Sequence, residues 1–301
     1  FDEQNNIQWA ERMEEAGCTL LYGAEGIKVH SKICLITRRD RGTIQYITQV
    51  GTGNYNEKTA KQYTDLCLIT ADPGIGGDAA AFFQNMATGN FAGDYRHLLV
   101  SPFGLRDRVM ELIDREMEKG EAGYLFFKLN SLTDRKLIDK LAQASQAGVE
   151  VVLNIRGICC LVPGVPGLTD RITVFSIVGR YLEHSRIYQF GRGEDAGLYL
   201  SSADFMTRNT ERRVEIACPV LDPWCRKRLF GIVEQLLRDN QKARLLQSDG
   251  TYVPRPAGDE SFDCQAYFQR ETVPAPLSFG RRAGREKAPL AGRLLRFFRR
   301  K

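Results

Sequence analysis

The stretch TLLYGAEGIKVHSKICLI, residues 19–36, recurs in altered form as TVFSIVGRYLEHSRIYQF, residues 173–190. In both copies a histidine, His30 or His184, lies 11 residues after the first threonine and precedes a serine and then a cation. Downstream, GTGNYN (51–56) leads to YTDLCLIT (63–70), as SSADFM (201–206) leads to RVEIACPV (213–220). The chain is therefore expected to contain two copies of one domain.

Strand-like and helix-like segments alternate along the chain, which predicts an α/β fold. The helix periodicity covers 7–17, 105–119 and 133–148, and the strand pattern covers 18–23, 28–38, 43–51, 122–130 and 149–157. A polar turn is expected around Asp40–Gly42. We predict a first domain over 1–95, a second over 96–250 and a basic, loosely structured tail over 251–301. The second copy has the extra segment Arg96–Val151 ahead of its motif, so the first domain is expected to be truncated at its N-terminus.

The composition is that of a globular protein, with 43% hydrophobic and 26% charged residues and a mean hydropathy of −0.31. This excludes collagen-like, disordered and disulfide-scaffold proteins. No apolar run approaches the roughly 20 residues needed to cross a bilayer. The eight cysteines form no CxxC and no zinc spacing, which favours reduced, buried thiols in a cytoplasmic protein.

Positive charge is concentrated at the C-terminus. Residues 281–301 carry nine Lys/Arg and one Glu, although the whole chain has a net charge of only +5. A mobile terminus is one interpretation. The other is contact with an anionic partner such as polyphosphate, nucleic acid or a membrane surface. Leu294, Leu295, Phe297 and Phe298 among the arginines could form a short interfacial helix, which would allow a peripheral contact with the inner face of the cell membrane; no specific nucleic acid is expected.

The repeated histidines suggest chemistry on phosphorus. Side chains alternate faces along a strand, so His30 and Lys32 are expected to point the same way, as are His184 and Arg186. An imidazole supplies a nucleophile, and a neighbouring fixed cation holds anionic oxygens. His97 lacks this context and is interpreted as incidental.

The segment Gly51–Asn54 follows a predicted strand and precedes a helix-like stretch, where backbone N–H groups can meet an anion. Four polar residues correspond between the copies at an offset of 150: Asn54 with Asp204, and Asp65 with Glu215. They are interpreted either as groups that orient the histidines or as residues that cap helices and satisfy turns.

These motifs resemble the phospholipase D superfamily pattern of HxK, an aspartate and then G-[ST]-x-N. The chain departs from the pattern because Thr37 and Gly191 stand where the aspartate is expected and Arg186 replaces the second lysine. Longer blocks narrow the resemblance, namely IKVHSKICLITRR, GTGNYNEKTAKQYTDLCLITADP, SPFGLRDRVMELIDRE, NIRGICCLVPGVPGL and SIVGRYLEHSRIY. Together they are similar to the C-terminal half of the bacterial polyphosphate kinase family, which has two tandem phospholipase-D-like α/β domains.

This resemblance implies reversible transfer of the ATP γ-phosphate to inorganic polyphosphate through a phosphohistidine. It implies His30 as the phosphorylated nucleophile, His184 as a phosphate contact and acid/base group, and Tyr63 and Arg156 as nucleotide-phosphate contacts. Lys32 and Arg186 are assigned to phosphate neutralisation from the strand geometry. The resemblance also implies ATP and ADP, Mg²⁺ bound with ATP, and a homo-oligomer. The family's arginine that helps hold metal-bound phosphates would lie just before residue 1, so metal-binding residues stay unassigned.

Two other functions stay open at this stage. A phospholipase-D-like phosphodiesterase, nuclease or phosphatidyltransferase would carry HxKxxxxD in both copies, and neither copy has it. A non-catalytic module that binds polyphosphate or nucleic acid would depend on the basic tail and not on the two histidines.

Overall fold

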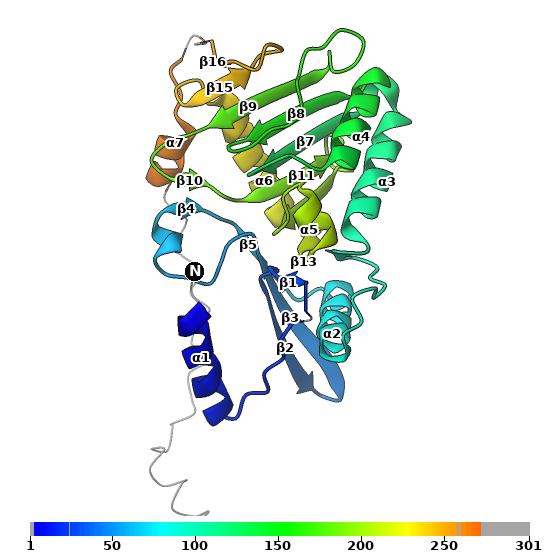
Figure 1. Cartoon of the computed structure of the whole chain (residues 1–301), viewed down its shortest axis with the longest axis vertical. Coiled ribbons are helices and arrows are strands. Elements are labelled where there is room, and N and C mark those ends of the chain that lie inside the picture. Colours follow the sequence, from blue (N-terminus) through cyan, green and yellow to red (C-terminus); the bar gives the residue numbers. More distant parts are fainter. Residues whose placement is uncertain (1–2, 24, 257, 259, 272–301) are drawn as a thin grey trace, which may run out of the picture. The chain divides into compact units, whose positions relative to one another are not determined.

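A computed structural model describes residues 3–23, 25–256, 258 and 260–271 of the 301-residue chain. Residues Phe1–Tyr267 form one compact unit of mixed helices and strands (Figure 1). The prediction of an α/β fold is confirmed. Because both repeats belong to this unit, the proposed division between residues 95 and 96 rests on the sequence repeat. The basic segment 281–301 lies outside the described residues.

The strands and helices follow the chain in this order. The strands are β1 (Lys28–Val29), β2 (Ile33–Asp40), β3 (Thr43–Gly51), β4 (Tyr63–Thr64), β5 (Cys67–Thr70), β6 (Leu99–Val100), β7 (Tyr124–Leu129), β8 (Glu150–Ile155), β9 (Ile172–Ile177), β10 (Leu182–Glu183), β11 (Arg186–Phe190), β12 (Gly197–Ser201), β13 (Arg213–Val214), β14 (Ile216–Pro219), β15 (Ala243–Leu246) and β16 (Tyr252–Pro254). The α-helices are α1 (Glu3–Glu15), α2 (Pro73–Thr88), α3 (Leu105–Met117), α4 (Arg135–Gln146), α5 (Thr207–Glu211), α6 (Pro223–Arg238) and α7 (Cys264–Arg270), with short 3-10 turns at Thr59–Lys61 and Gly120–Ala122.

The second repeat is built on a nine-stranded sheet of order β16-β15-β9-β8-β7-β11-β12-β14-β6. Its central strands β7, β8 and β9 run parallel, and every residue of β7 is buried. Strands buried on both faces read as nearly continuous apolar runs, as YLFFKL does except for Lys128. The buried side chains of α3 and α4 join one face of this sheet in a single apolar core, and α6 lies behind the sheet in Figure 1.

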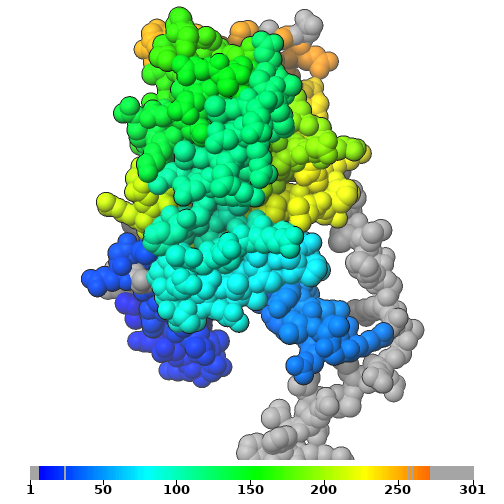
Figure 2. Space-filling view, turned by 90° about the vertical axis from the view of Figure 1, so that its right-hand side faces the viewer, coloured from blue at the N-terminus to red at the C-terminus, as the bar shows by residue number. Residues whose placement is uncertain are grey.

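The first repeat has a three-stranded antiparallel sheet, β2-β3-β5, against which α2 packs. The predicted turn at Asp40–Gly42 is confirmed, with positive φ values of 48° at Arg41 and 87° at Gly42. Residues 36–44 around this turn are all exposed, and Figure 2 shows the blue end of the hairpin standing out from the surface. Helix α2 approaches the sheet closely at Gly76, where a Cβ atom would lie 2.3 Å from Cβ of Tyr46.

Two short parallel pairs join the repeats to each other. β1 of the first repeat pairs with β13 of the second, and β10 of the second pairs with β4 of the first. Each pair ends one residue before a functional position, at His30 and Glu215 in one case and at His184 and Asp65 in the other. The two bridges therefore bring a histidine of each repeat to a carboxylate of the other repeat.

The predicted strand over 18–23 is wrong. Its counterpart, β9, is a strand because it pairs with β8 on one side and β15 on the other. In the first repeat the chain before residue 18 forms α1, which offers no strand edge. Leu21 and Tyr22 are accordingly 56% and 76% exposed, and the described part of 18–23 makes no strand pairing.

Two further expectations need correction. The segment after residue 250 is not loose throughout, because β16 pairs with β15 and α7 buries Cys264 completely.

The cysteines are not generally buried either, since Cys18, Cys34, Cys67 and Cys160 are exposed, and only Cys218 and Cys264 are buried. The hydrophobic strand pattern around Cys34 and Cys67 failed to predict burial because one face of the β2-β3-β5 sheet is open. All eight are free thiols, as expected.

No helix within the described residues is long and apolar enough to cross a membrane.

Candidate active site

His30 is held by a buried carboxylate of the second repeat. Its Nδ1 lies 2.9 Å from Oε2 of Glu215, whose side chain is completely buried. Glu215 also accepts hydrogen bonds at 2.5 Å from the hydroxyl of Ser202 and the side-chain amide of Asn209. With its carboxylate fixed by these neutral donors, Glu215 orients the ring of His30 and favours a proton on Nδ1. The opposite nitrogen, Nε2, has no hydrogen-bond partner within the described part of the chain.

His184 is held in the same way by the first repeat. Its Nδ1 lies 2.9 Å from both carboxylate oxygens of Asp65, and Asp65 accepts a 2.6 Å hydrogen bond from Thr52. Burial opposes the charge of Asp65, but the hydrogen bonds from His184 and Thr52 outweigh it and lower its pKa. Burial lowers the pKa of His184, and the nearby Arg186 acts in the same direction against Asp65. The pair is thus a neutral imidazole beside an ionised carboxylate at neutral pH.

The backbone repeats this geometry. The N–H groups of His30 and Ser31 both donate to the carbonyl of Val214, at 2.9 Å, and those of His184 and Ser185 donate to the carbonyl of Thr64, at 3.2 and 2.8 Å. The prediction that His30 and Lys32 share one continuous strand is wrong, because β1 ends at Val29 and β2 begins at Ile33. The strand is interrupted because the backbone pairs with β13 up to Val29 and with β3 from Ile33 onward.

The two cations beside the histidines are buried and have protein partners. Arg186 pairs with Asp204 at 3.0 Å and also donates to the carbonyls of Thr52 and His184. The Lys32 ammonium donates to the carbonyl of His30 and is 5% exposed. Burial lowers its pKa to about 8, although Glu215 opposes this shift. Both residues lie at the junction of the two repeats, where they add positive charge next to the histidines.

Two further predicted residues lie next to His184. The ring of Tyr63 is 5.0 Å from the imidazole ring of His184 between centroids. Arg156 donates from Nε to the side chain of Asn130 and to the carbonyl of Glu183, both at 2.6 Å. Both bonds come from Nε, and among the residues that the structure describes the terminal nitrogens of this half-buried side chain have no hydrogen-bond partner, so they can meet an anion.

Asn54 and His97 are less closely tied to this arrangement. Asn54 is exposed, and its side chain makes no hydrogen bond to another described residue. The ring of His97 lies against Gly74 at the start of α2, where a Cβ atom would meet its Nε2 at 2.4 Å. Asp204, the counterpart of Asn54, is a buried partner of Arg186.

Thr52 and Ser202 belong to the site, but the spacing analysis did not single them out. They correspond at the same offset of 150 as Asp65 and Glu215, and each hydroxyl donates to the carboxylate of its own repeat. The repeat therefore contained the signal that could have found them. Nothing comparable in the sequence identified Asn209 or Asn130.

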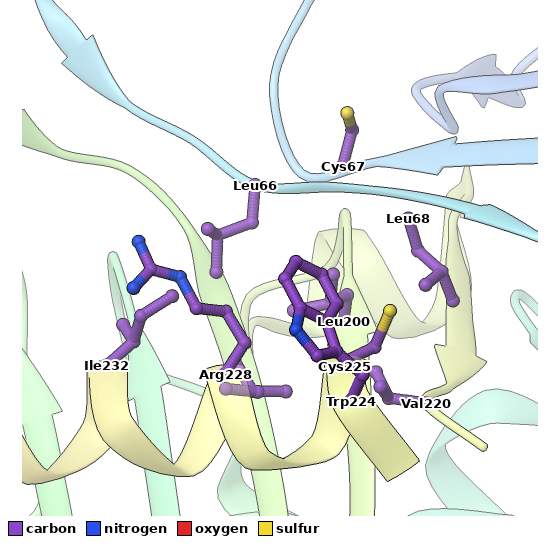
Figure 3. Close-up of a pocket in the computed structure, with 10 residues that line it drawn as sticks. Leu66, Cys67, Leu68, Leu200, Val220, Trp224, Cys225, Arg228 and Ile232 are labelled. Atoms are coloured by element: carbon purple, nitrogen blue, oxygen red, sulfur yellow. The ribbon is translucent and has the colours of Figure 1, made fainter. Parts of the chain in front are cut away.

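An apolar pocket is lined by the residues that follow Asp65 in the chain and by residues of α6. Figure 3 shows Leu66 and Leu68 pointing toward α6, which contributes Trp224 and Ile232, whereas Cys67 points away. Its lining lacks histidines and carboxylates, so the pocket offers none of the chemistry of the histidine pair.

Comparison with known proteins agrees with this architecture. Family models described as Polyphosphate kinase C-terminal domain 1 and Polyphosphate kinase C-terminal domain 2 match residues 1–91 and 98–265, respectively. The chain belongs to the polyphosphate kinase family. The polyphosphate kinase of Bacillus cereus is 48% identical over 255 residues, which are 84% of this chain and 36% of that protein. That of Staphylococcus haemolyticus is 46% identical over 277 residues, 91% of this chain and 38% of that protein.

A solved structure supports the same relationship. The crystal structure of polyphosphate kinase from Porphyromonas gingivalis matches with a TM-score of 0.81 at 40% identity. The match covers 88% of this chain and 42% of that chain. The chain thus spans well under half the length of the polyphosphate kinases with which it was compared.

Proposed function

We propose that this chain carries the phosphoryl-transfer site of a polyphosphate kinase, with His30 as the nucleophile. The observation that supports this most strongly is the difference between the two histidines. Nδ1 of His30 is fixed by the fully buried Glu215, and its Nε2 has no hydrogen-bond partner among the described residues, whereas Nε2 of His184 lies 3.2 Å from Arg186 Nη1. An imidazole that is oriented through one nitrogen and open at the other is arranged for attack.

The proposed reaction has two displacements. The lone pair of His30 Nε2 attacks the γ-phosphorus of ATP, a P–N bond forms, and the bond to the bridging oxygen breaks so that ADP leaves. A terminal oxygen of polyphosphate then attacks the phosphohistidine, the P–N bond breaks, and the polymer is one phosphate longer. The reverse sequence makes ATP. Phosphoryl transfer depends mainly on positioning and charge neutralisation, and the two strand pairs between the repeats position both histidines.

The other site residues would bind the donor phosphates. His184, Tyr63 and Arg156 lie together at the β4–β10 bridge, so they form one side of the site. His184, a neutral imidazole near pH 7, would contact the donor phosphates and would accept a proton from the attacking terminal phosphate in the second displacement, while ADP leaves as an oxyanion in the first. Lys32 and Arg186 would stabilise negative charge from beneath the histidines without leaving their protein partners.

The described residues do not provide a Mg²⁺ site of their own. Over the described ranges no three His, Cys, Asp or Glu side chains come together in a way that could hold a metal ion. The carboxylates at the site are committed to His30, His184 and Arg186. Mg²⁺ would therefore enter with ATP as part of the substrate. Homo-oligomer formation and a membrane contact of residues 281–301 stay predictions.

The test is the mass of the chain and of its peptides after mixing with Mg²⁺ and polyphosphate. We expect an acid-labile gain of one phosphoryl group on the His30 peptide. His30→Ala should abolish this gain, and a folded His184→Ala variant should reduce it. Polyphosphate is used because the donor's adenine is then not needed for binding.

Two outcomes would overturn this assignment. A phosphoryl group on His184 would reverse the roles of the two histidines. A folded chain that binds polyphosphate but gains no phosphoryl group on either histidine would identify a binding module rather than a catalytic one.

A further inference from the structure

A buried ion pair lies directly behind His184. Glu183, the residue before His184, is 5% exposed, and its Oε2 lies 3.1 Å from Nζ of Lys128, which is 2% exposed. Taking two charges out of water costs free energy that their attraction often does not recover, so a buried pair is weak evidence of a contribution to stability. Replacing both with apolar residues would often be neutral or stabilising, which raises the question of what the carboxylate does.

The Glu183 carboxylate connects four elements. Besides Lys128 on β7, it accepts a 2.9 Å hydrogen bond from Thr64 on β4 and a 2.7 Å bond from Gln265 on α7. Glu183 itself belongs to β10. Its polar contacts thus hold the end of β10 against the first repeat, the central sheet and the C-terminal helix together.

The hydrogen bond between Thr64 and Glu183 lies next to the contact between Asp65 and His184. In the β4–β10 bridge Glu183 pairs with Thr64, and the next residues on the two strands are His184 and Asp65. The Thr64–Glu183 bond is therefore one residue behind the Asp65–His184 contact. The backbone carbonyl of Glu183 also accepts from Arg156 Nε at 2.6 Å. Displacing Glu183 would move His184, which is the next residue in the chain, and Arg156, which is bonded to the carbonyl of Glu183.

The β1–β13 bridge has no carboxylate at the position that corresponds to Glu183. At the offsets of the repeat, Glu183 corresponds to Val29 and Thr64 to Val214, and these two valines pair in the β1–β13 bridge. An apolar pair is therefore sufficient to hold His30 near Glu215. Of the two repeats, only the second has a buried carboxylate directly before its histidine, on the side that carries Tyr63, His184 and Arg156.

We propose that Glu183 is a positioning residue that fixes His184 and Arg156 for binding the phosphates of the donor. The proposal rests on the proposed function of this site. Glu183 touches no substrate; it acts through the β4–β10 bridge and through its backbone carbonyl. Its loss should therefore weaken donor binding more than it slows the transfer step itself.

The test measures the rate of phosphohistidine formation on His30 at increasing polyphosphate concentrations. For Glu183→Gln we expect the half-saturating polyphosphate concentration to rise about tenfold or more, as for loss of a hydrogen bond to a charged group. The rate at saturation should change much less. Thr64→Val leaves the Lys128–Glu183 pair intact and removes the bond to Glu183 together with the longer contacts of the same hydroxyl with the His184 N–H (3.3 Å) and the Leu182 carbonyl (3.4 Å), so it should also raise half-saturation.

A double variant separates positioning from folding. Glu183→Gln leaves the charge of Lys128 buried with the neutral Ser185 carbonyl as its remaining hydrogen-bond partner and no carboxylate, which can unfold the chain. Glu183→Gln with Lys128→Met removes that charge, so its melting temperature should return toward that of the wild type while half-saturation stays raised. Asp139→Asn, which breaks the exposed Arg135–Asp139 pair, serves as the matched control and should change neither quantity.

The outcomes distinguish the two proposals. If the double variant or Thr64→Val binds polyphosphate as the wild type does, Glu183 is only part of a structural ion pair and the inference is wrong. If the wild type itself forms no phosphohistidine, the proposed function fails instead.

Discussion

At the scale of single residues, the site depends on which carboxylate orients which histidine. Glu215 is completely buried and holds His30, whereas Asp65 is 25% exposed and holds His184. The more buried carboxylate fixes its ring more firmly, because Ser202 and Asn209 leave it no alternative partner. This difference supports the proposal that His30 is the nucleophile and His184 a phosphate contact.

Glu215→Gln should therefore slow phosphorylation of His30 strongly. An amide can donate to Nδ1 and so favour the tautomer that carries its proton on Nε2, which cannot attack. We expect a decrease on the order of 10²–10⁴-fold, as when the partner of a catalytic histidine is neutralised. The initial rate of phosphohistidine formation at saturating polyphosphate measures it. Asp65→Asn is the matched variant, and an equal loss of rate in the two would contradict the assigned roles.

Donor binding should weaken as the pH rises through about 8. Burial lowers the pKa of Lys32 to about 8, so this ammonium is charged below that pH and neutral above it. A neutral lysine no longer attracts phosphate, and the half-saturating polyphosphate concentration should rise between pH 7 and 9. Lys32→Arg keeps its charge over this range and should lose the dependence. The same pH profile in this variant would assign the effect to another group.

At the scale of elements, the packing of α2 on the first sheet is closest at Gly76. Alanine normally stabilises a helix by about 1 kcal/mol relative to glycine. At Gly76 the added methyl group would meet Tyr46 at 2.3 Å, so Gly76→Ala should instead lower the free energy of unfolding by about 1–3 kcal/mol. Gly77→Ala is the control, because a Cβ there meets nothing within 4 Å. Denaturant unfolding of both variants checks this, and equal stability of the two would refute the close contact.

The sequence predicted elements well where their own residues decide them and poorly where neighbours do. The apolar run of β7 and the turn at Asp40–Gly42 follow from local chemistry. Residues 18–23 have the same strand pattern as β9 but lack a neighbouring strand edge, and propensity alone cannot supply one. Spacing found His30, His184, Asp65 and Glu215, but it could not show that each pair crosses between repeats. Glu183 and Lys128 escaped notice because charged residues usually mark a solvated face.

At the scale of the whole molecule, neither repeat can build its half of the site alone. The His30–Glu215 pair should therefore be energetically coupled across the repeats. In a double-mutant cycle on the free energy of unfolding, His30→Ala and Glu215→Gln should show a coupling of about 0.5–3 kcal/mol. His30→Ala and Asp65→Asn, which do not share a contact in the structure, should be additive within about 0.5 kcal/mol. Coupling in the second pair without coupling in the first would contradict the crossed arrangement.

The chemical identity of the phosphohistidine tests this mechanism most directly. With Glu215 on Nδ1, only Nε2 of His30 is open to phosphorus. The ¹⁵N-labelled chain, phosphorylated from polyphosphate and kept at alkaline pH, can be examined by ³¹P–¹⁵N correlation NMR, with His30→Ala to assign the signal. A single phosphorus coupled to Nε2 of His30 is the expected result. A phosphoryl group on Nδ1 of His30, or on His184, would show that the two carboxylates do not direct the reaction as described.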